Sequence, residues 1–361
     1  MSVRRMDHIY VSESQVERQG NMSNGCETIL TIREDSKPVV SILMFSAGLV
    51  GNVLALVLLG VRRKEIRTKS SVFCILVTGL AVTDLMGTCF LSPVVFVSYA
   101  QKKSLIGLVG VHTLCDFFSF AMTFFGVAST LILFAMAVER CLAISHPYFY
   151  SQHIGRSFAK SALPVIYAFA ALFCIMPLAG FGEYRQYCPG TWCFLKMESD
   201  NSAVVGFSLL YATLIAFLIV AILLCNGSVI VSLCKMHRNQ RTRRGSVLSS
   251  QRRRKSWFGQ REEEVDHLIL LAAMTAIFAI CSLPLTIRGF INAITPGNKE
   301  NEDLMAFRFY AFNPIVDPWL FIILRKSVFR SCQQILCCRF SMSLNNSAFQ
   351  EPFKQQSISL C

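Results

Sequence analysis

Long apolar stretches alternate with short polar segments along the first 324 residues of the chain. A helix that crosses a bilayer needs about 20 mostly apolar residues. Seven stretches of roughly this length occupy residues 39–61, 72–98, 112–138, 161–182, 203–234, 266–288 and 304–324. The pattern predicts an all-α membrane protein, built as a bundle of seven transmembrane helices.

Composition and charge agree with this prediction. Of the 361 residues 53% are hydrophobic and only 16% are charged, which is typical of a membrane protein. Cytoplasmic segments carry the excess of lysine and arginine. With the amino terminus outside, 23 of the 35 lysines and arginines lie on the inner side, so we expect an extracellular amino terminus. Anionic lipid headgroups then explain the formal charge of +13 without nucleic acid.

The spans divide the chain into three parts. Residues 1–38 are expected to form an extracellular tail, and residues 39–324 the transmembrane domain. Residues 325–361 are expected to form a short amphipathic helix and a cytoplasmic tail. The amphipathic stretch "RKSVFRSCQQILCCRF" offers three cysteines that are either palmitoylated or free thiols: Cys332, Cys337 and Cys338.

Residues 235–265, between the fifth and sixth spans, form a strongly basic third cytoplasmic loop. The text "RTRRGSVLSSQRRRKSWFGQREEE" has no apolar periodicity, so it favours a solvated loop near anionic lipid. It also suits partner docking and phosphorylation. Ser246 and Ser256 each follow clustered basic residues, whose positive charge a phosphate would cancel.

Four cysteines fall on the outer side of the expected topology: Cys26, Cys115, Cys188 and Cys193. An even number in an oxidising compartment indicates two disulfides, with three possible connectivities. Cys188 and Cys193 are neighbours in "QYCPGTWCF", which favours links from this loop to two different places over a link between them. In the outer tail, Asn21 begins a sequon and is a candidate for glycosylation.

Two charges in the seventh span call for a function. An Arg or Asp at the centre of a membrane helix costs roughly 2.5–3.5 kcal/mol on insertion scales. Arg308 and Asp317 are nine residues apart, which puts them about 13 Å apart along a helix and on opposite sides of it. Each therefore needs its own partner. For Arg308 two readings remain: it reaches outward to lipid headgroups, or its planar fork binds the carboxylate of a lipid ligand.

Other classes of membrane protein fit the sequence less well. A transporter is expected to show internal repeats with broken helices, and a channel needs a filter loop or rings of charge. Neither is visible. The six histidines form no i, i+3 or i, i+4 pair, so we expect no metal site and no enzyme activity. A receptor fits better, and a lipid transporter remains the alternative from another class.

Several motifs carry a resemblance to a known family over residues 39–340. They are "GLVGNVLAL", "LAVTDL", "MAVERCLAISHPYFY", "CSLP" and "DPWLF", one for each of spans one, two, three, six and seven. The chain resembles the rhodopsin-like G-protein-coupled receptors. "ERC" replaces their usual Asp-Arg-Tyr and "DPWLF" their usual Asn-Pro-x-x-Tyr. Together with "QYCPGTWCF", these variants resemble the prostanoid receptors.

This resemblance implies a ligand and its site. Prostanoids are lipids with a carboxylate at one end, and the family's arginine of span seven matches Arg308. Tyr99 and Thr191 match hydroxyls that share the carboxylate, and Phe120 and Phe307 are expected to line the channel for the apolar chains. The resemblance favours prostacyclin as ligand, with prostaglandin D2 or E2 as alternatives. It also implies the plasma membrane as location, and a stimulatory G protein that raises cyclic AMP as partner.

The resemblance also implies a switch and one disulfide. Arg140 of "ERC" is expected to pair with Glu139 or with Glu264, and Pro284 to kink span six. In mid-membrane, Asp84 and Asp317 are expected to share a proton or a sodium ion, with Asn52 completing the cluster; the alternative is a purely structural network. The family pattern implies a disulfide between Cys115 and Cys193, which leaves Cys26 for Cys188.

Overall fold

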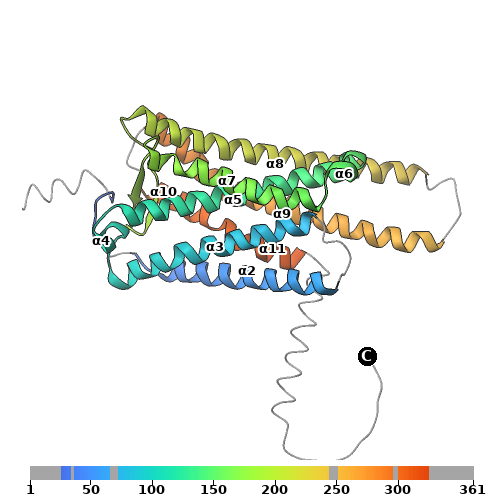
Figure 1. Ribbon diagram of the computed structural model, residues 1–361, viewed down its shortest axis with the longest axis horizontal. Helices are drawn as coiled ribbons and strands as arrows, with labels where there is room; N and C mark the ends of the chain where they lie inside the picture. Colours follow the sequence, from blue (N-terminus) through green and yellow to red (C-terminus); the bar gives the residue numbers. More distant parts are fainter. Residues whose placement is uncertain (1–25, 34–35, 66–71, 244–250, 296–299, 325–361) are drawn as a thin grey trace, which may run out of the picture.

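The computed structural model describes residues 26–33, 36–65, 72–243, 251–295 and 300–324. Long helices lie side by side in an elongated bundle (Figure 1). The main helices are α2 (Val39–Glu65), α3 (Val72–Gln101), α5 (Thr113–Ser145), α7 (Arg156–Ile175), α8 (Ser202–Arg243), α9 (Gln251–Ile294), α10 (Glu300–Ala311) and α11 (Asn313–Leu324). The predicted all-α architecture is confirmed.

Each predicted span has its counterpart among these helices. In the described part of the chain five helices are long and apolar enough to cross a membrane: α2, α3, α5, α8 and α9. The fourth predicted span corresponds to α7, whose apolar part, Lys160–Ile175, is shorter. The seventh corresponds to α10 and α11 together, each 12 residues long.

The break between α10 and α11 lies at Phe312 and has a local cause. Pro314, the second residue of α11, has no backbone N–H, so the carbonyl of Tyr310 four residues earlier cannot receive its usual helical hydrogen bond. The chain turns tightly here, because the amide of Phe312 donates to the carbonyl of Phe309 at 3.1 Å. The amides of Ile315 and Val316 donate back to the carbonyl of Phe312. The two helices thus follow one another with a single turn between them.

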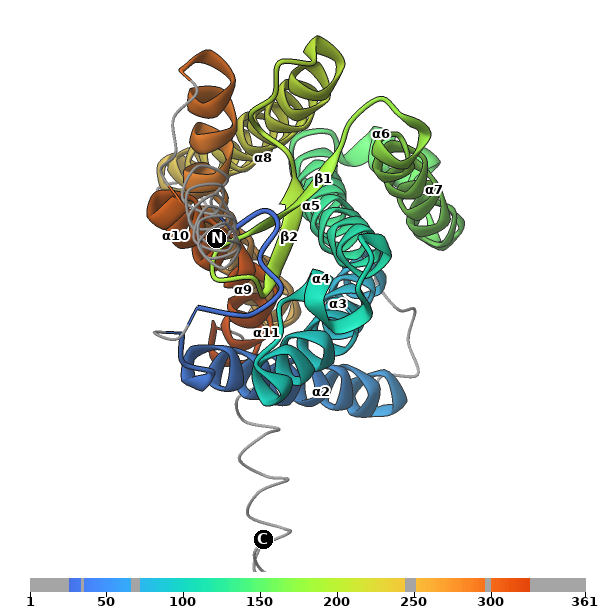
Figure 2. The same ribbon diagram turned by 90° about the vertical axis from the view of Figure 1, so that its left-hand side faces the viewer.

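The bundle is arranged around α5. This helix packs against α3, α7 and α8, while α2 packs against α3 and α11, and α9 against α8, α10 and α11. Figure 2, which looks along the bundle, shows α7 on the outside, next to α5. The central position of α5 agrees with its many fully buried side chains, among them Val127, Ala128 and Met136.

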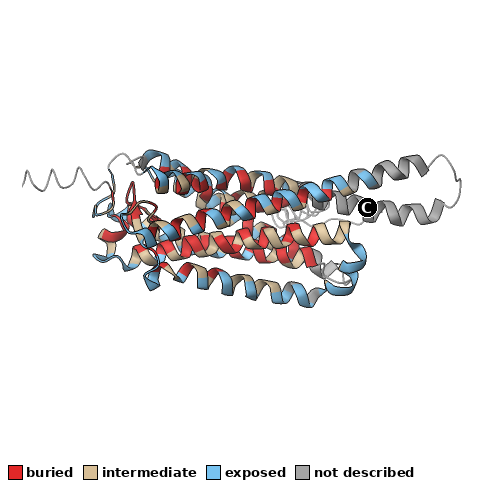
Figure 3. Cartoon of the chain, turned by 90° about the horizontal axis from the view of Figure 1, so that it is seen from above, coloured by how far each residue is buried: buried red, intermediate tan, exposed pale blue. Residues whose placement is uncertain are grey.

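The outer surface of the bundle is strongly apolar. Val57 of α2, Phe217 of α8 and Ile280 of α9 are each more than half exposed, and the exposed positions alternate with buried ones along the helices (Figure 3). Water-soluble monomers rarely expose such large contiguous apolar surface. The surface suits lipid, so the chain is a multi-pass membrane protein.

A two-stranded hairpin and the amino-terminal residues 26–33 cover one end of the bundle, referred to below as the hairpin end (Figure 2). Strand β1 (Tyr184–Tyr187) pairs antiparallel with β2 (Trp192–Leu195). Gln186 of β1 donates from Nε2 to the carbonyls of Cys26 and Ile29 at 2.9 and 3.0 Å. These bonds hold the amino-terminal residues on the hairpin.

The basic segment 235–265 differs from the predicted loop. Helix α8 continues to Arg243 and α9 begins at Gln251, so most of the segment is helical. Arg, Lys, Gln and Glu are good helix formers, and both helices simply extend beyond their apolar parts. The amphipathic helix expected after span seven lies outside the described residues.

Candidate functional site

An aromatic cluster lies directly beneath the hairpin and is centred on Phe307 of α10. The Phe307 ring is fully buried and stacks on Trp192 of β2, with centroids 6.2 Å apart and planes at 13°. Tyr187 and Phe194 meet the same ring edge-on at 4.9 and 5.2 Å. Phe307 therefore joins α10 to the hairpin, a packing role in addition to the ligand contact expected from the sequence.

Thr191, next to Trp192, has an unusual environment. Its side chain is fully buried, yet its hydroxyl has no hydrogen-bond partner. An unpaired buried polar group costs about 1–3 kcal/mol, so such groups often mark a place for a ligand or water. The structure therefore leaves this hydroxyl fully buried and unpaired.

Arg308 lies in the last turn of α10, next to Phe307. The residue is half-buried, and no hydrogen bond or ion pair to its side chain is seen in the described part of the chain. Tyr99 is also half-buried, near the end of α3, and packs against the hydrophobic core. Arg308, Tyr99 and Thr191 thus all lie toward the hairpin end, and their role in binding a ligand stays a prediction.

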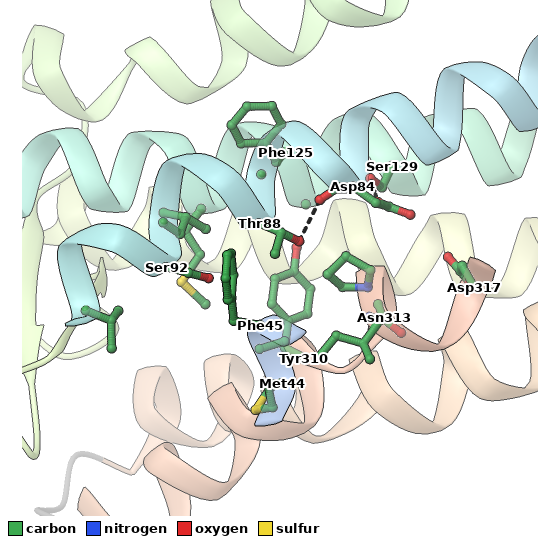
Figure 4. A pocket seen from close by; sticks show the side chains of 18 of the residues that line it. Met44, Phe45, Asp84, Thr88, Ser92, Phe125, Ser129, Tyr310, Asn313 and Asp317 are labelled. Atoms are coloured by element: carbon green, nitrogen blue, oxygen red, sulfur yellow. Dashed lines mark hydrogen bonds between the residues drawn. The ribbon is translucent and has the colours of Figure 1, made fainter. Parts of the chain in front are cut away.

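A cavity of about 150 Å³ extends inward from the aromatic cluster (Figure 4). Trp192 and Phe118 line it near the hairpin, and Asp84 and Asp317 line its deeper part. Most of its wall is apolar, from Met44 and Phe45 of α2 and Phe125 of α5, among others. Ligand pockets commonly enclose about 300–1,000 Å³, so a drug-sized ligand has to widen this cavity.

Of the five residues expected to bind ligand, none lines the cavity itself. Phe120 stacks instead on Phe124, whose ring packs against Tyr167 of α7. Phe120 therefore lies toward α7, and the neighbouring residues Phe118 and Met122 face the cavity. The ligand role of Phe120 stays a prediction without support from this geometry.

Tyr310 of α10 is a cavity residue that sequence analysis missed. Its hydroxyl lies 3.1 Å from the hydroxyl of Tyr211 on α8, and both residues are buried. The same hydroxyl rests on Gly126 of α5, where a Cβ atom would collide with it. Only glycine allows this approach, through which Tyr310 joins three helices at the cavity wall.

The deep part of the cavity is polar. Asp84 of α3 accepts a hydrogen bond from the Ser129 hydroxyl at 2.7 Å, while its Oδ2 is buried without a partner. Asp317 of α11 is 4% exposed and lines the same space (Figure 4). Two buried carboxylates in one cavity disfavour double ionisation. The structure thus brings Asp84 and Asp317 into one cavity, as predicted.

Asn52 of α2 has a mainly structural environment. Its Nδ2 donates to the carbonyls of Gly48 and Pro314 at 3.0 and 2.9 Å, so it links α2 to α11. Its Oδ1 is buried without a partner. Asn52 does not line the cavity that holds Asp84 and Asp317.

Arg140 and Glu139 form a charge pair at the opposite end of the bundle. Nη2 of Arg140 donates to Oε1 of Glu139 at 2.6 Å, and Nε donates to Oε2, so the pair is bidentate. Tyr150 of α6 (Pro147–His153) donates its hydroxyl to Glu139 at 2.6 Å. Burial and the bond to Glu139 raise the pKa of Tyr150, which stays neutral. The Arg140 guanidinium also lies over the Phe73 ring, 4.7 Å from its centroid.

The alternative partner Glu264 belongs to α9, but its side chain is outside the described part of the structure. The same holds for Ser256. Asn21, Ser246 and the three tail cysteines Cys332, Cys337 and Cys338 also lie outside the described residues. Their predicted modifications stay predictions. Pro284 lies inside α9, which continues through it.

Both expected disulfides are present. Cys115 at the start of α5 is bonded to Cys193 of β2, and Cys26 is bonded to Cys188 in the hairpin turn. The first bond joins the hairpin to the bundle, and the second joins it to the amino-terminal residues. The hairpin is thereby held across the end of the bundle.

The sequence and the fold of this chain both match those of a known family of membrane proteins. Residues 51–321 match the family described as 7 transmembrane receptor (rhodopsin family). The chain belongs to the rhodopsin family of seven-transmembrane receptors. The crystal structure of squid rhodopsin shows the same fold, with a TM-score of 0.70 at 16% identity over 90% of this chain and 88% of that one.

Within that family the chain is similar to receptors for prostanoids. It is 57% identical to the prostacyclin receptor of Rattus norvegicus, over 90% of this chain and 76% of that protein. Identity to the prostacyclin receptor of Homo sapiens is 56%, over 88% and 80%. The prostaglandin E2 receptor EP2 subtype of Homo sapiens is 48% identical, over 90% and 94%. The resemblance to prostanoid receptors is confirmed, and these relatives are receptors, not enzymes.

Proposed function

We propose that the chain is a plasma-membrane receptor for prostacyclin that activates the stimulatory G protein and raises cyclic AMP. The observation that carries the ligand proposal is Arg308, a half-buried guanidinium with no side-chain partner in the described part of the chain, on the helix α10 that contributes Tyr310 and Ala311 to the wall of the apolar cavity. A prostanoid supplies what this arrangement lacks: one carboxylate for Arg308 and apolar chains for the cavity. The similarity to prostacyclin receptors favours prostacyclin.

The carboxylate end of the ligand belongs at the hairpin end of the bundle. Arg308 supplies a permanent charge and a planar pair of donors. The Thr191 hydroxyl, buried and unpaired, supplies a further donor. Arg308, Thr191 and Tyr99 of α3 together bind the carboxylate, each from a different element of the fold. The chains then extend past Trp192 toward Tyr310 and widen the cavity.

The covered end of the bundle favours entry of the ligand from the bilayer. Two disulfides hold the hairpin across this end of the bundle, and residues 26–33 are hydrogen-bonded to the hairpin. The distribution of lysine and arginine supports the proposal that the hairpin end is extracellular. A lipid that partitions into the outer leaflet reaches the bundle without opening this cover.

Signalling is proposed to break the Arg140–Glu139 pair. Arg140 is 8% exposed and is held by Glu139, which Tyr150 fixes in turn. An outward movement of α9 at this end, pivoting near Pro284, would free Arg140 for the G protein. For the deep part of the cavity, we propose that Asp84 and Asp317 share a proton or hold a sodium ion in the inactive state.

A panel of prostanoids on transfected cells tests this proposal. Cells without prostanoid receptors of their own would express the chain, and cyclic AMP would be measured against a stable prostacyclin analogue, prostaglandin E2 and prostaglandin D2. The analogue is expected to act at the lowest concentration. Greater potency of prostaglandin E2 would instead favour the second candidate, which rests on the 48% identity to the EP2 receptor. A response to none of them would refute the prostanoid proposal.

A further inference from the structure

Two free cysteines on neighbouring helices, Cys141 of α5 and Cys225 of α8, lie side by side in the half of the bundle away from the hairpin. Their thiols are close enough to interact electrostatically and as hydrogen-bonding partners. Both residues are partly exposed, and neither takes part in a disulfide. The two observed disulfides lie at the hairpin end, so this pair is separate from them. No step of the proposed receptor mechanism uses it.

A second contact shows how the two helices face each other. The hydroxyls of Ser145 on α5 and Ser232 on α8 lie 3.0 Å apart. Ser145 follows Cys141 by four residues and Ser232 follows Cys225 by seven, and residues one or two turns apart share a face of a helix. Both helices run away from the hairpin end, since α5 begins near the Cys115 disulfide and α8 shortly after β2. The cysteine pair and the serine pair thus belong to one contact between α5 and α8.

A disulfide fits this contact without a rearrangement of the backbone. The helices α5 and α8 pack directly on one another. Axes of packed helices are about 8–10 Å apart, and each Cα atom lies about 2.3 Å from its own axis. Cα atoms that face one another are therefore roughly 3–6 Å apart, which overlaps the range of about 4.4–6.8 Å that disulfides span. Rotation of the two side chains is enough to bring the sulfur atoms together.

The surroundings of the pair decide which oxidant reaches it. Cys141 directly follows Arg140, at the end opposite the hairpin, which is cytoplasmic under the proposed function. Thiols in the cytoplasm are normally kept reduced by glutathione. A peroxide changes this state, because a thiolate attacks its O–O bond. Cys141 lies beyond the apolar stretch 112–138, nearer to water, so it is the thiol that a peroxide meets first.

We propose that Cys141 and Cys225 form a peroxide-sensitive thiol pair that closes into a reversible disulfide between α5 and α8. The Cys141 thiolate attacks one oxygen of hydrogen peroxide to give a sulfenic acid, and the leaving hydroxide takes up the thiol proton to form water. The sulfur of Cys225 then attacks the sulfenic sulfur, whose hydroxyl leaves with the Cys225 proton as a second water. One peroxide thereby oxidises both thiols. Exchange with a reduced dithiol reopens the bond.

The disulfide restrains the end of the bundle that carries Arg140, and the consequence for signalling rests on the proposed function. Arg140 neighbours Cys141 and is held by Glu139. Its release for the G protein needs an outward movement of α9, which packs against α8. Once α8 is tied to α5 beside Arg140, α9 has to slide along a fixed α8. Oxidation is therefore expected to lower the loading of the G protein with GTP.

Peptide mapping of the purified full chain in detergent micelles tests the disulfide itself. The chain is treated with hydrogen peroxide, remaining thiols are blocked with N-ethylmaleimide, and the digest is analysed by mass spectrometry without reduction. We expect a linked Cys141–Cys225 peptide, absent from Cys141→Ser and from Cys225→Ser. Cys74→Ser is the matched control, because Cys74 is also partly exposed and lies at the same end of the bundle, near the start of α3; it should leave the linked peptide unchanged. Oxidation of Cys141 or Cys225 to sulfinic acid without a peptide that joins them would overturn the proposal.

Loading of an added G protein with GTP tests the restraint. Peroxide is removed with catalase before the G protein is added, and the prostacyclin analogue serves as agonist. Loading by the oxidised chain should fall at least about fivefold, a typical coupling between sites, and thioredoxin should restore it. Cys225→Ser should be insensitive to peroxide, and Cys74→Ser should respond like the native chain. Unchanged loading in spite of a complete cross-link would overturn the restraint. A reduced chain that loads no G protein with any prostanoid would refute the proposed function, and the mapped peptide alone would then decide the disulfide.

Discussion

Replacement of Gly126 by alanine tests the packing of the cavity wall most sharply. The added methyl group would collide with the hydroxyl of Tyr310, and the ring carbon Cζ lies only 2.8 Å from the same position. Tyr310 has to move, and its 3.1 Å contact with Tyr211 is lost. One methyl group on α5 thus disturbs α8 and α10 as well.

The expected loss of stability follows from three contributions. Alanine gains about 1 kcal/mol over glycine within a helix. Overpacking in a well-packed interior costs about 1–3 kcal/mol, and the lost hydrogen bond costs about 1 kcal/mol. The net effect is a destabilisation of about 1–3 kcal/mol, although alanine is the better helix former.

A double-mutant cycle isolates the clash. Tyr310→Phe removes the hydroxyl that lies on Gly126, so Gly126→Ala should cost at least about 1 kcal/mol less in that background than in the native chain. Unfolding can be followed with a thiol-reactive dye, because Cys174 and Cys281 are free and buried. Equal costs of Gly126→Ala in both backgrounds would show that Tyr310 does not rest on Gly126.

Three further predictions concern other parts of the receptor. Tyr150→Phe loosens Glu139 and should raise agonist-free GTP loading of an added G protein about two- to tenfold, as for the loss of one hydrogen bond; unchanged loading would contradict the role given to this contact. Phe307→Ala leaves a void under the hairpin and should destabilise the chain by about 3–5 kcal/mol, whereas Phe307→Leu should cost less in the same thermal assay. Asp84→Asn should abolish any difference in agonist affinity between sodium and choline buffers; a persisting difference would place sodium elsewhere.

The spans were predictable because lipid imposes a simple requirement on length and apolarity. The ends of the helices were not, since α8 and α9 extend into basic sequence that gives no apolar signal. The break at Phe312 follows from Pro314, but one proline does not distinguish a kink from a full interruption. The two disulfides needed the family pattern, since four outer cysteines alone allow three pairings.

The candidate site was predictable where a residue type is rare in its setting. Arg308 and Asp317 stand out as charges within an apolar span. Tyr310 and Phe125 do not, because one of nine tyrosines and one of 29 phenylalanines carries no signal of its position. Arg288 lies at the end of a predicted span, where arginine is common, and its two carboxylate partners, Glu302 and Asp303, appear only when α10 packs against α9.

The central proposal, that the chain binds a lipid carboxylate, depends on Arg308. Replacement by alanine removes a charge-assisted contact of about 1.5–3 kcal/mol, so acid ligands should lose about tenfold to over a hundredfold in affinity. Lysine should restore only part of it, because it lacks the planar fork. The decisive measurement is radioligand competition by a prostacyclin analogue and its methyl ester, on membranes matched for receptor number. The account predicts a large loss for the acid and a small one for the ester on Arg308→Ala; equal losses for both would mean that Arg308 holds the shape of the site and does not bind the carboxylate.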